Sequence, residues 1–124
     1  MTTLKKQIFE FATQILGFDD CRFTDPKLDS EITHYKEWIA RGHYGDMGYL
    51  KEHVQFKENP ELLLKKARSA IVLIKNYKNT PEKTQTNRLK IARYAVGEDY
   101  HVVIRKKLET LKGFIQSEAP DVKC

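Results

Sequence analysis

The apolar run at residues 69–74, SAIVLI, constrains the fold of this sequence more than any other stretch. A short, continuous run of apolar residues that includes several β-branched side chains is typical of a strand buried on both faces. Such strands usually belong to a sheet that helices cover on both sides, so the run predicts an α/β protein. It has about a third of the roughly 20 apolar residues that span a bilayer and does not predict a membrane helix.

Apolar residues that recur at helical spacing predict helices on either side of this strand. In the first of them the apolar stripe is Leu4, Ile8, Phe11 and Ile15, and Gly17 is placed to end it. Helices are expected at residues 4–15, 26–41 and 98–117, with shorter helical segments at residues 47–53 and after Asn59-Pro60.

A weaker edge strand is expected at residues 18–24, where Cys21 and Phe23 lie among polar residues. One good strand and one or two weak ones predict a small mixed sheet flanked by helices. The predicted helices need more strands than that, so the sheet is expected to be incomplete because the chain ends early. A length of 124 residues suits one domain, which we expect to occupy residues 1–124.

The formal charge of +5 is concentrated in one third of the chain. Residues 51–93 carry eleven lysines and arginines against four glutamates, whereas the rest of the chain has a slight acidic excess. A basic patch of this kind attracts nucleic acid by releasing counterions from phosphates. A solvated basic surface without a partner has the same composition, so both interpretations stay open at this point.

The two cysteines, Cys21 and Cys124, and the four histidines show no spacing that would hold a metal ion or a cluster. No metal site is therefore predicted in this chain. The N-terminal residues lack the apolar block and cleavage site of a signal peptide. We accordingly expect a cytoplasmic location and no membrane partner.

Three motifs in register resemble the N-terminal domain of epoxyqueuosine reductase. They are the glycine-rich turn GDMGYL at residues 45–50, ENPELLLKKARSAIVLIKNY at residues 58–77 and ARYAVGEDYH at residues 92–101. The counterparts in that family read approximately MGYL, P-x-LLLP-x-A-(R/K)-S and ARYA-x-G-x-DYH, and the last of these is specific. The resemblance covers nearly the whole chain.

Members of this family are cytoplasmic bacterial enzymes of queuosine biosynthesis. The resemblance implies an oxidoreductase that reduces epoxyqueuosine to queuosine at the wobble position of tRNA. It implies cobalamin as cofactor, together with two four-iron four-sulfur clusters in a ferredoxin-like module of the full-length enzyme. It also implies that the present domain forms part of the cobalamin pocket, that the tRNA anticodon region lies across a basic surface, and that the full-length enzyme is monomeric.

The chain departs from the family pattern at its C-terminal end. The cluster cysteines, the C-terminal repeats and the proposed catalytic aspartate of the family all lie beyond Cys124. We therefore expect this chain to be the front third of the enzyme and to be inactive alone. One possibility is that a companion polypeptide carries the rest. Whether the chain counts as an enzyme stays open, and the alternatives are a small basic tRNA- or RNA-binding adaptor without catalysis and a decayed fragment.

The resemblance places five residues at the cobalamin pocket and none in catalysis. Lys57 matches a basic position that contacts the corrinoid, although a solvated lysine is the alternative. Ala92, Arg93 and Tyr94 match the segment beside the cofactor, where backbone groups and the guanidinium can bond polar groups. Gly97 permits a positive φ or a close approach by a flat macrocycle, or it is an ordinary glycine at the entry to a helix.

Contacts with substrate tRNA are expected from Tyr77, Arg88 and Lys90. Tyr77 is the main candidate for stacking on a base in this basic part of the chain. Stacking aromatics are otherwise not interleaved with the basic residues, which argues against the adaptor.

The helix that follows the ARYAVGEDYH motif begins with three residues that could be structural or functional. Asp99 is expected to cap the helix through the backbone amides of its first turn. Tyr100 shares a stripe with apolar residues further along and is expected in the core. His101 is expected to be a structural histidine and not a cobalt ligand, since the resemblance implies that cobalamin is held without a histidine below the metal.

Overall fold

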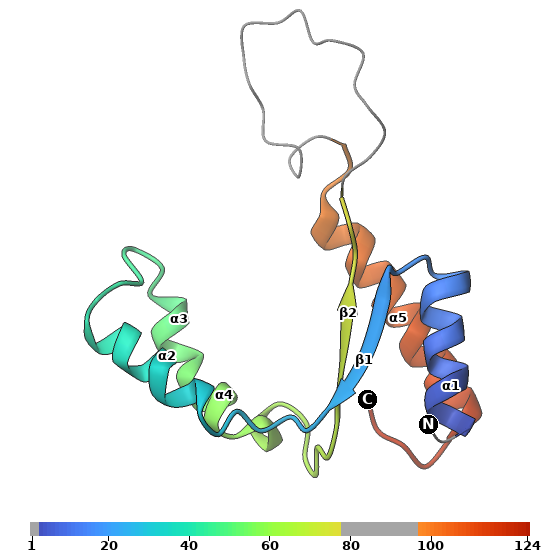
Figure 1. Ribbon diagram of the computed structural model, residues 1–124, viewed down its shortest axis with the longest axis horizontal. Helices are drawn as coiled ribbons and strands as arrows, with labels where there is room; N and C mark the ends of the chain where they lie inside the picture. The colour runs from blue at the N-terminus through green and yellow to red at the C-terminus, as the bar shows by residue number, and fades with distance from the viewer. Residues whose placement is uncertain (1–2, 78–96) are drawn as a thin grey trace, which may run out of the picture. The chain divides into compact units, whose positions relative to one another are not determined.

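The computed structural model describes residues 3–77 and 97–124 (Figure 1). The chain divides into two compact units. The first unit consists of Met1–Arg22 and Leu73–Cys124, and the second unit consists of Phe23–Val72. Helices and a small sheet are both present, which confirms the predicted α/β class. Within the described ranges no helix is long and apolar enough to cross a membrane.

The core of the first unit includes the facing sides of two helices, α1 (Thr3–Glu10) and α5 (Tyr100–Glu118) (Figure 1). The ring of Phe11, just after α1, stacks on the ring of Phe114 in α5, with their centroids 4.1 Å apart. Both helices bury one apolar stripe and leave their charged faces in solvent, as amphipathic helices do. The buried residues among those described are Ile8, Ala12, Phe18, Cys21, Leu111 and Ile115.

A π-helical turn, Phe11–Ile15, follows α1 and turns the end of the predicted stripe away from the core. The N–H of Leu16 donates to the carbonyl of Phe11 at 3.0 Å, one residue further back than in an α-helix. This wider turn rotates Ile15 into solvent, where it is 69% exposed. The expected continuation of the apolar stripe to Ile15 is wrong for this reason. Gly17 then ends the helix with a φ of +70°, as predicted.

Two strands, β1 (Asp20–Thr24) and β2 (Ala70–Ile74), form a two-stranded antiparallel sheet at the places where the sequence predicts them (Figure 1). Along β2, Val72 and Ile74 are 48% and 52% exposed, whereas Leu73 between them is half-buried. This period of two is typical of a strand with one covered and one open face. The prediction that the run is buried on both faces is wrong, because the described residues cover only one of them.

The second unit is built from three short helices and a 3-10 turn, which are α2 (Glu31–Ala40), α3 (Tyr49–Glu52), α4 (Val54–Glu58) and Pro60–Leu62. α2 begins later than expected, because the Asp25 carboxylate accepts the N–H of Lys27 at 2.8 Å and forms a turn there. Asn59 caps the 3-10 turn by accepting the N–H of Glu61 at 3.2 Å. The Leu-rich segment is thus shorter than a regular helix, and no residue of this unit is fully buried.

Candidate functional site

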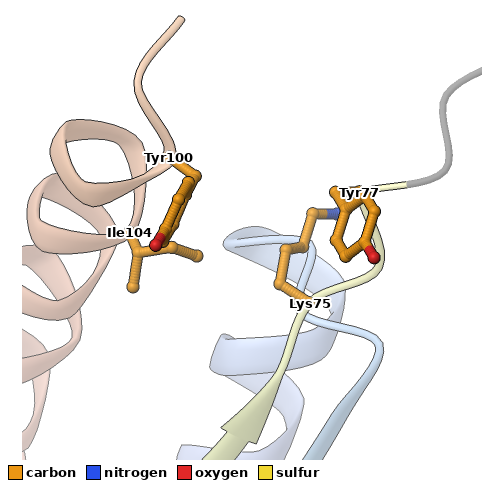
Figure 2. Close-up of a pocket in the computed structure, with 4 residues that line it drawn as sticks. All are labelled: Lys75, Tyr77, Tyr100 and Ile104. Carbon is orange, nitrogen blue, oxygen red and sulfur yellow. The ribbon is translucent and has the colours of Figure 1, made fainter. Parts of the chain in front are cut away.

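A pocket opens in the first unit between the end of β2 and the start of α5 (Figure 2). Lys75 and Tyr77 line it from the strand side, and Tyr100 and Ile104 line it from the helix side. Its volume is about 350 Å³, which lies at the lower end of the range for small-molecule sites. Two aromatic rings, one aliphatic side chain and few polar groups are the mixture that such sites usually present.

Gly97 and Asp99 set the start of α5 and thereby the helix side of the pocket. Gly97 has a φ of +109°, the positive value that its position in the motif suggested. The Asp99 carboxylate accepts the N–H of His101 at 2.9 Å and caps α5, which confirms the prediction. This backbone hydrogen bond, with a second one to the His101 ring, lowers the pKa of Asp99 below its ordinary value. Tyr100 and Ile104, four residues apart, then share one face of the helix (Figure 2).

Tyr100 lies at the pocket and not in the core, so the sequence prediction for this residue is wrong. Its side chain is 48% exposed, and the same stripe of α5 is fully buried only at Leu111 and Ile115. The core contacts of α5 with α1 therefore belong to the later turns of the helix, and the first turns keep their apolar side chains accessible. The Tyr100 ring stacks on the ring of His101, with centroids 4.0 Å apart.

Three hydrogen bonds tie the end of β2 to the turn before β1 and fix the strand side of the pocket. The N–H of Asp19 donates to the carbonyl of Ile74 at 2.8 Å. The Lys75 ammonium donates to the carbonyl of Gly17 at 2.6 Å and lies 3.9 Å from the Asp19 carboxylate. That carboxylate accepts the N–H of Asn76 at 2.6 Å. Lys75 is therefore held at the pocket with its charge partly balanced.

Tyr77 is the residue at which the sequence prediction and the pocket coincide. It was expected to contact substrate, and it lines the pocket with 61% of its side chain exposed. Five of the residues expected at the cofactor or the substrate lie outside the described ranges; they are Arg88, Lys90, Ala92, Arg93 and Tyr94.

Lys57 lies in the second unit, at the last turn of α4, where it is half-buried. Its ammonium sits 5.1 Å from the centroid of the Tyr35 ring, close enough for a cation–π interaction. Tyr35 is in turn fixed by its hydroxyl, which donates to the carbonyl of Leu50 at 2.8 Å. An ion pair between Lys36 and Glu58 joins α2 to α4 beside it. The ammonium of Lys57 thus contacts an aromatic ring of its own unit.

A second hollow, of about 740 Å³, runs along the first half of α5 and is lined mainly by charged side chains. The His101 ring lies on Asp99, with Nδ1 and Oδ1 2.8 Å apart, which is the local structural role suggested for it. Lys106 pairs with Glu98 at 3.6 Å. Among residues 3–77 and 97–124 no group of three or more histidines, cysteines, aspartates or glutamates could hold a metal ion.

Two pocket residues, Lys75 and Ile104, were not singled out from the sequence. Ile104 belongs to an apolar helical stripe and is indistinguishable there from a core residue. Lys75 directly follows the apolar run of β2, and this change from apolar to charged at a strand end is the one signal that pointed to it. Their proximity follows from the fold, since β2 and α5 lie far apart in the sequence.

Comparison with known proteins identifies one family. Residues 57–124 match the family model described as epoxyqueuosine reductase QueG, DUF1730. Curated epoxyqueuosine reductases of Cyclobacterium marinum and Leadbetterella byssophila are each 34% identical over 98% of this chain, which covers 41% and 40% of their lengths. The epoxyqueuosine reductase of Cellulophaga algicola is 37% identical over 86% of this chain and 35% of its own length. The chain thus spans about two fifths of the relatives it matches, and no solved structure gives a significant match.

Proposed function

Because this chain belongs to the epoxyqueuosine reductase family, we propose that it supplies the N-terminal part of an enzyme that reduces epoxyqueuosine to queuosine in tRNA. The observation that carries the proposal is the family match over residues 57–124, because this range contains the described residues that line the pocket of the first unit. The shared sequence therefore includes a pocket with the composition of a ligand site.

The proposed substrate is the modified base at the wobble position of a bacterial tRNA, and the proposed location is the cytoplasm. Removal of an epoxide oxygen consumes electrons and protons, so the complete enzyme is an oxidoreductase. Tyr77 is proposed to contact the base, because its ring is exposed at the pocket and aromatic rings stack on any base. Arg88 and Lys90 are proposed to contact phosphates of the anticodon region, in the basic third of the sequence.

Cobalamin is the proposed cofactor, and the residues at the pocket suit part of a corrinoid. The ring of Tyr100 and the side chain of Ile104 offer apolar surface on the helix side of the pocket. Gly97, which has a positive φ and no side chain, stands before the helix side of the pocket. When bound, cobalamin supplies a cobalt centre that passes electrons to the substrate.

The other residues proposed to bind cobalamin rest on the family motifs, and the support for them differs. Ala92, Arg93 and Tyr94 are proposed to line the cofactor on the strength of the family motif that contains them. Lys57 is the weakest of the assignments, because its ammonium already contacts the Tyr35 ring.

The iron–sulfur clusters proposed for the complete enzyme do not fit the residues of this chain. A four-iron cluster is usually held by four cysteine thiolates, and the sequence contains two cysteines in all. Cys21 is buried in the core of the first unit, whereas Cys124 is exposed. We therefore propose that the clusters are carried by a further part of the same polypeptide or by a separate polypeptide.

A chimera tests the proposed function. This chain replaces the segment it matches in the Cyclobacterium marinum enzyme, and the chimera is expressed in a bacterium that lacks its own epoxyqueuosine reductase. We expect tRNA nucleosides analysed by mass spectrometry to contain queuosine with the chimera and with the parent enzyme. The parent without the segment, and this chain alone, are expected to leave epoxyqueuosine in place. A soluble chimera that leaves tRNA as epoxyqueuosine contradicts the proposal.

A further inference from the structure

We propose that the open face of β2 is a docking surface for an amphipathic helix from the part of the enzyme that lies outside this chain. The inference rests on the proposed function, in which the chain is one part of a longer enzyme. The open face carries alternate side chains of β2, and those of Val72 and Ile74 are 48% and 52% exposed. Leu73 between them lies on the opposite face, because successive side chains of a strand alternate, and it is half-buried.

The sequence of β2 does not match an open face. All of its residues, AIVLI, are apolar, whereas a strand with one face in water normally alternates apolar and polar side chains. A continuous apolar strand is typical of the interior of a sheet that is covered on both faces. The described residues of this chain cover one face, so the strand has the composition for a second cover that they do not supply.

β1 shows the alternation that β2 lacks, and it limits where the second cover can lie. Cys21 is 2% exposed, and its neighbours Asp20 and Arg22 lie on the other face, where the Arg22 Nε donates to the Asp20 carboxylate at 2.8 Å. The Arg22 side chain is 76% exposed. Charged side chains on an outer strand favour solvent and discourage other elements from adding there. The open face therefore changes from charged on β1 to apolar on β2, and the cover is expected over β2 alone.

The dimensions of the apolar strip indicate the shape of its partner. Ala70, Val72 and Ile74 lie along one face of β2, and a rise of about 3.3 Å per residue makes the strip about 13 Å long. This length corresponds to roughly two and a half turns of an α-helix, whose pitch is about 5.4 Å. Since sheets in α/β proteins are covered by helices, one amphipathic helix with an apolar stripe of that length fits the strip.

The occupant comes from the part of the enzyme outside this chain. The chain spans about two fifths of the relatives it matches, so most of a complete enzyme is available to supply the helix. Within a complete enzyme such a helix is held near the sheet at a high effective concentration, which favours its docking over that of a partner from solution. The competing occupant is a second copy of this chain, which the labelling experiment distinguishes.

Thiol labelling tests whether the open face is covered in the complete enzyme. Ile74→Cys and Val72→Cys are each combined with Cys124→Ser, because Cys124 is exposed whereas Cys21 is buried. Labelling by a maleimide at each position is followed by peptide mass spectrometry in the chain alone and in the chimera with the Cyclobacterium marinum enzyme. We expect labelling to be slower in the chimera by about tenfold or more, because the contact must open before the thiol reacts.

Arg22→Cys is the matched control, since Arg22 is exposed on the same face of the sheet but belongs to the charged strand. Its labelling rate is expected to stay within about threefold between the chain and the chimera. A photo-crosslinking amino acid at position 74 of the chimera is expected to join a segment outside this chain whose apolar residues recur three and four positions apart. Apolar residues at every second position of the joined segment would indicate a strand and contradict the proposed helix.

The inference is overturned if Val72→Cys and Ile74→Cys react as fast in the chimera as in the chain alone, or if Arg22→Cys is slowed as much as they are. Slower labelling of the chain alone at higher protein concentration identifies a second copy as the occupant and also overturns it. Failure of the proposed function is a separate result. A chimera that produces queuosine with an unprotected β2 refutes only the docking surface, and a protected β2 in an inactive chimera refutes only the proposed function.

Discussion

Replacing Leu111 by alanine tests whether α5 is held by its second half, as its burial indicates. Leu111 is 3% exposed and lies in the small core of the first unit with Ile8 and Ile115. Removing a buried leucine side chain loses its transfer free energy and leaves a cavity, which together destabilise by roughly 2–5 kcal/mol. Because the described core has only six buried residues, the surroundings can relax in part, and we expect a loss of about 3 kcal/mol.

Leu108→Ala is the matched control on the same helix. Leu108 precedes Leu111 by less than one turn but is 44% exposed, so its truncation removes less buried surface and leaves no closed cavity. We expect a loss of about 1 kcal/mol or less. Since leucine and alanine both favour helix, the comparison is little affected by propensity.

The measurement is urea-induced unfolding followed by circular dichroism, with the m-value compared between variants. A loss of about 3 kcal/mol is a large share of the 5–15 kcal/mol typical of domains, so the difference between the variants is readily measured. Equal losses for Leu111→Ala and Leu108→Ala would refute the view that the later turns of α5 anchor the helix and leave its first turns free for the pocket.

The remaining predictions concern the ends of the helices in the first unit. Gly97→Ala is expected to destabilise the protein by about 1 kcal/mol or more, because φ at this position is +109°. Gly113→Ala, inside α5, is expected to stabilise it by about 0.5–1 kcal/mol, because the added methyl group meets no atom within 4 Å. The midpoints of urea-induced unfolding compare the two variants. Asp99→Ala is expected to lower stability at neutral pH. Because folding lowers the pKa of Asp99, this difference is present above its unfolded pKa and shrinks as the pH falls through the folded value, and a difference independent of pH contradicts the assignment. Lys107→Met removes the ammonium that bonds the carbonyl of Leu16, and faster amide hydrogen exchange near the end of the π-helical turn is expected, with unchanged exchange as the contrary result.

Features carried by local sequence were predicted well. The cap formed by Asp99 and the positions of the two strands follow from short-range preferences that few neighbours can override, and the positive φ of Gly97 is one of the alternatives that its sequence position left open. The end of α1 was not predictable in this way. A π-helical turn leaves no distinct mark in an apolar stripe, so Ile15 was counted with a face that it leaves.

Of the pocket's described lining residues, the sequence singled out Tyr77 for a ligand and placed Tyr100 in the core. Tyr77 was expected to contact tRNA because of its aromatic ring in a basic segment; it lines the pocket, and the contact itself stays a prediction. Tyr100 was placed in the core because periodicity shows which face of a helix is apolar and not how far along the helix that face is covered. Lys57 depended on the family motif, and its engagement with Tyr35 is a tertiary contact that no local pattern contains.

β1 and β2 each pass from one unit to the other, so the chain leaves the first unit and returns to it through neighbouring antiparallel strands. The second unit is in this sense an insertion between two paired strands, at a position where a short hairpin turn could take its place. Since the entropy of closing a loop rises slowly with its length, such an inserted segment can grow, shrink or be exchanged at little cost to the sheet that carries it. Evolution can therefore remodel the second unit separately from the pocket that the first unit forms.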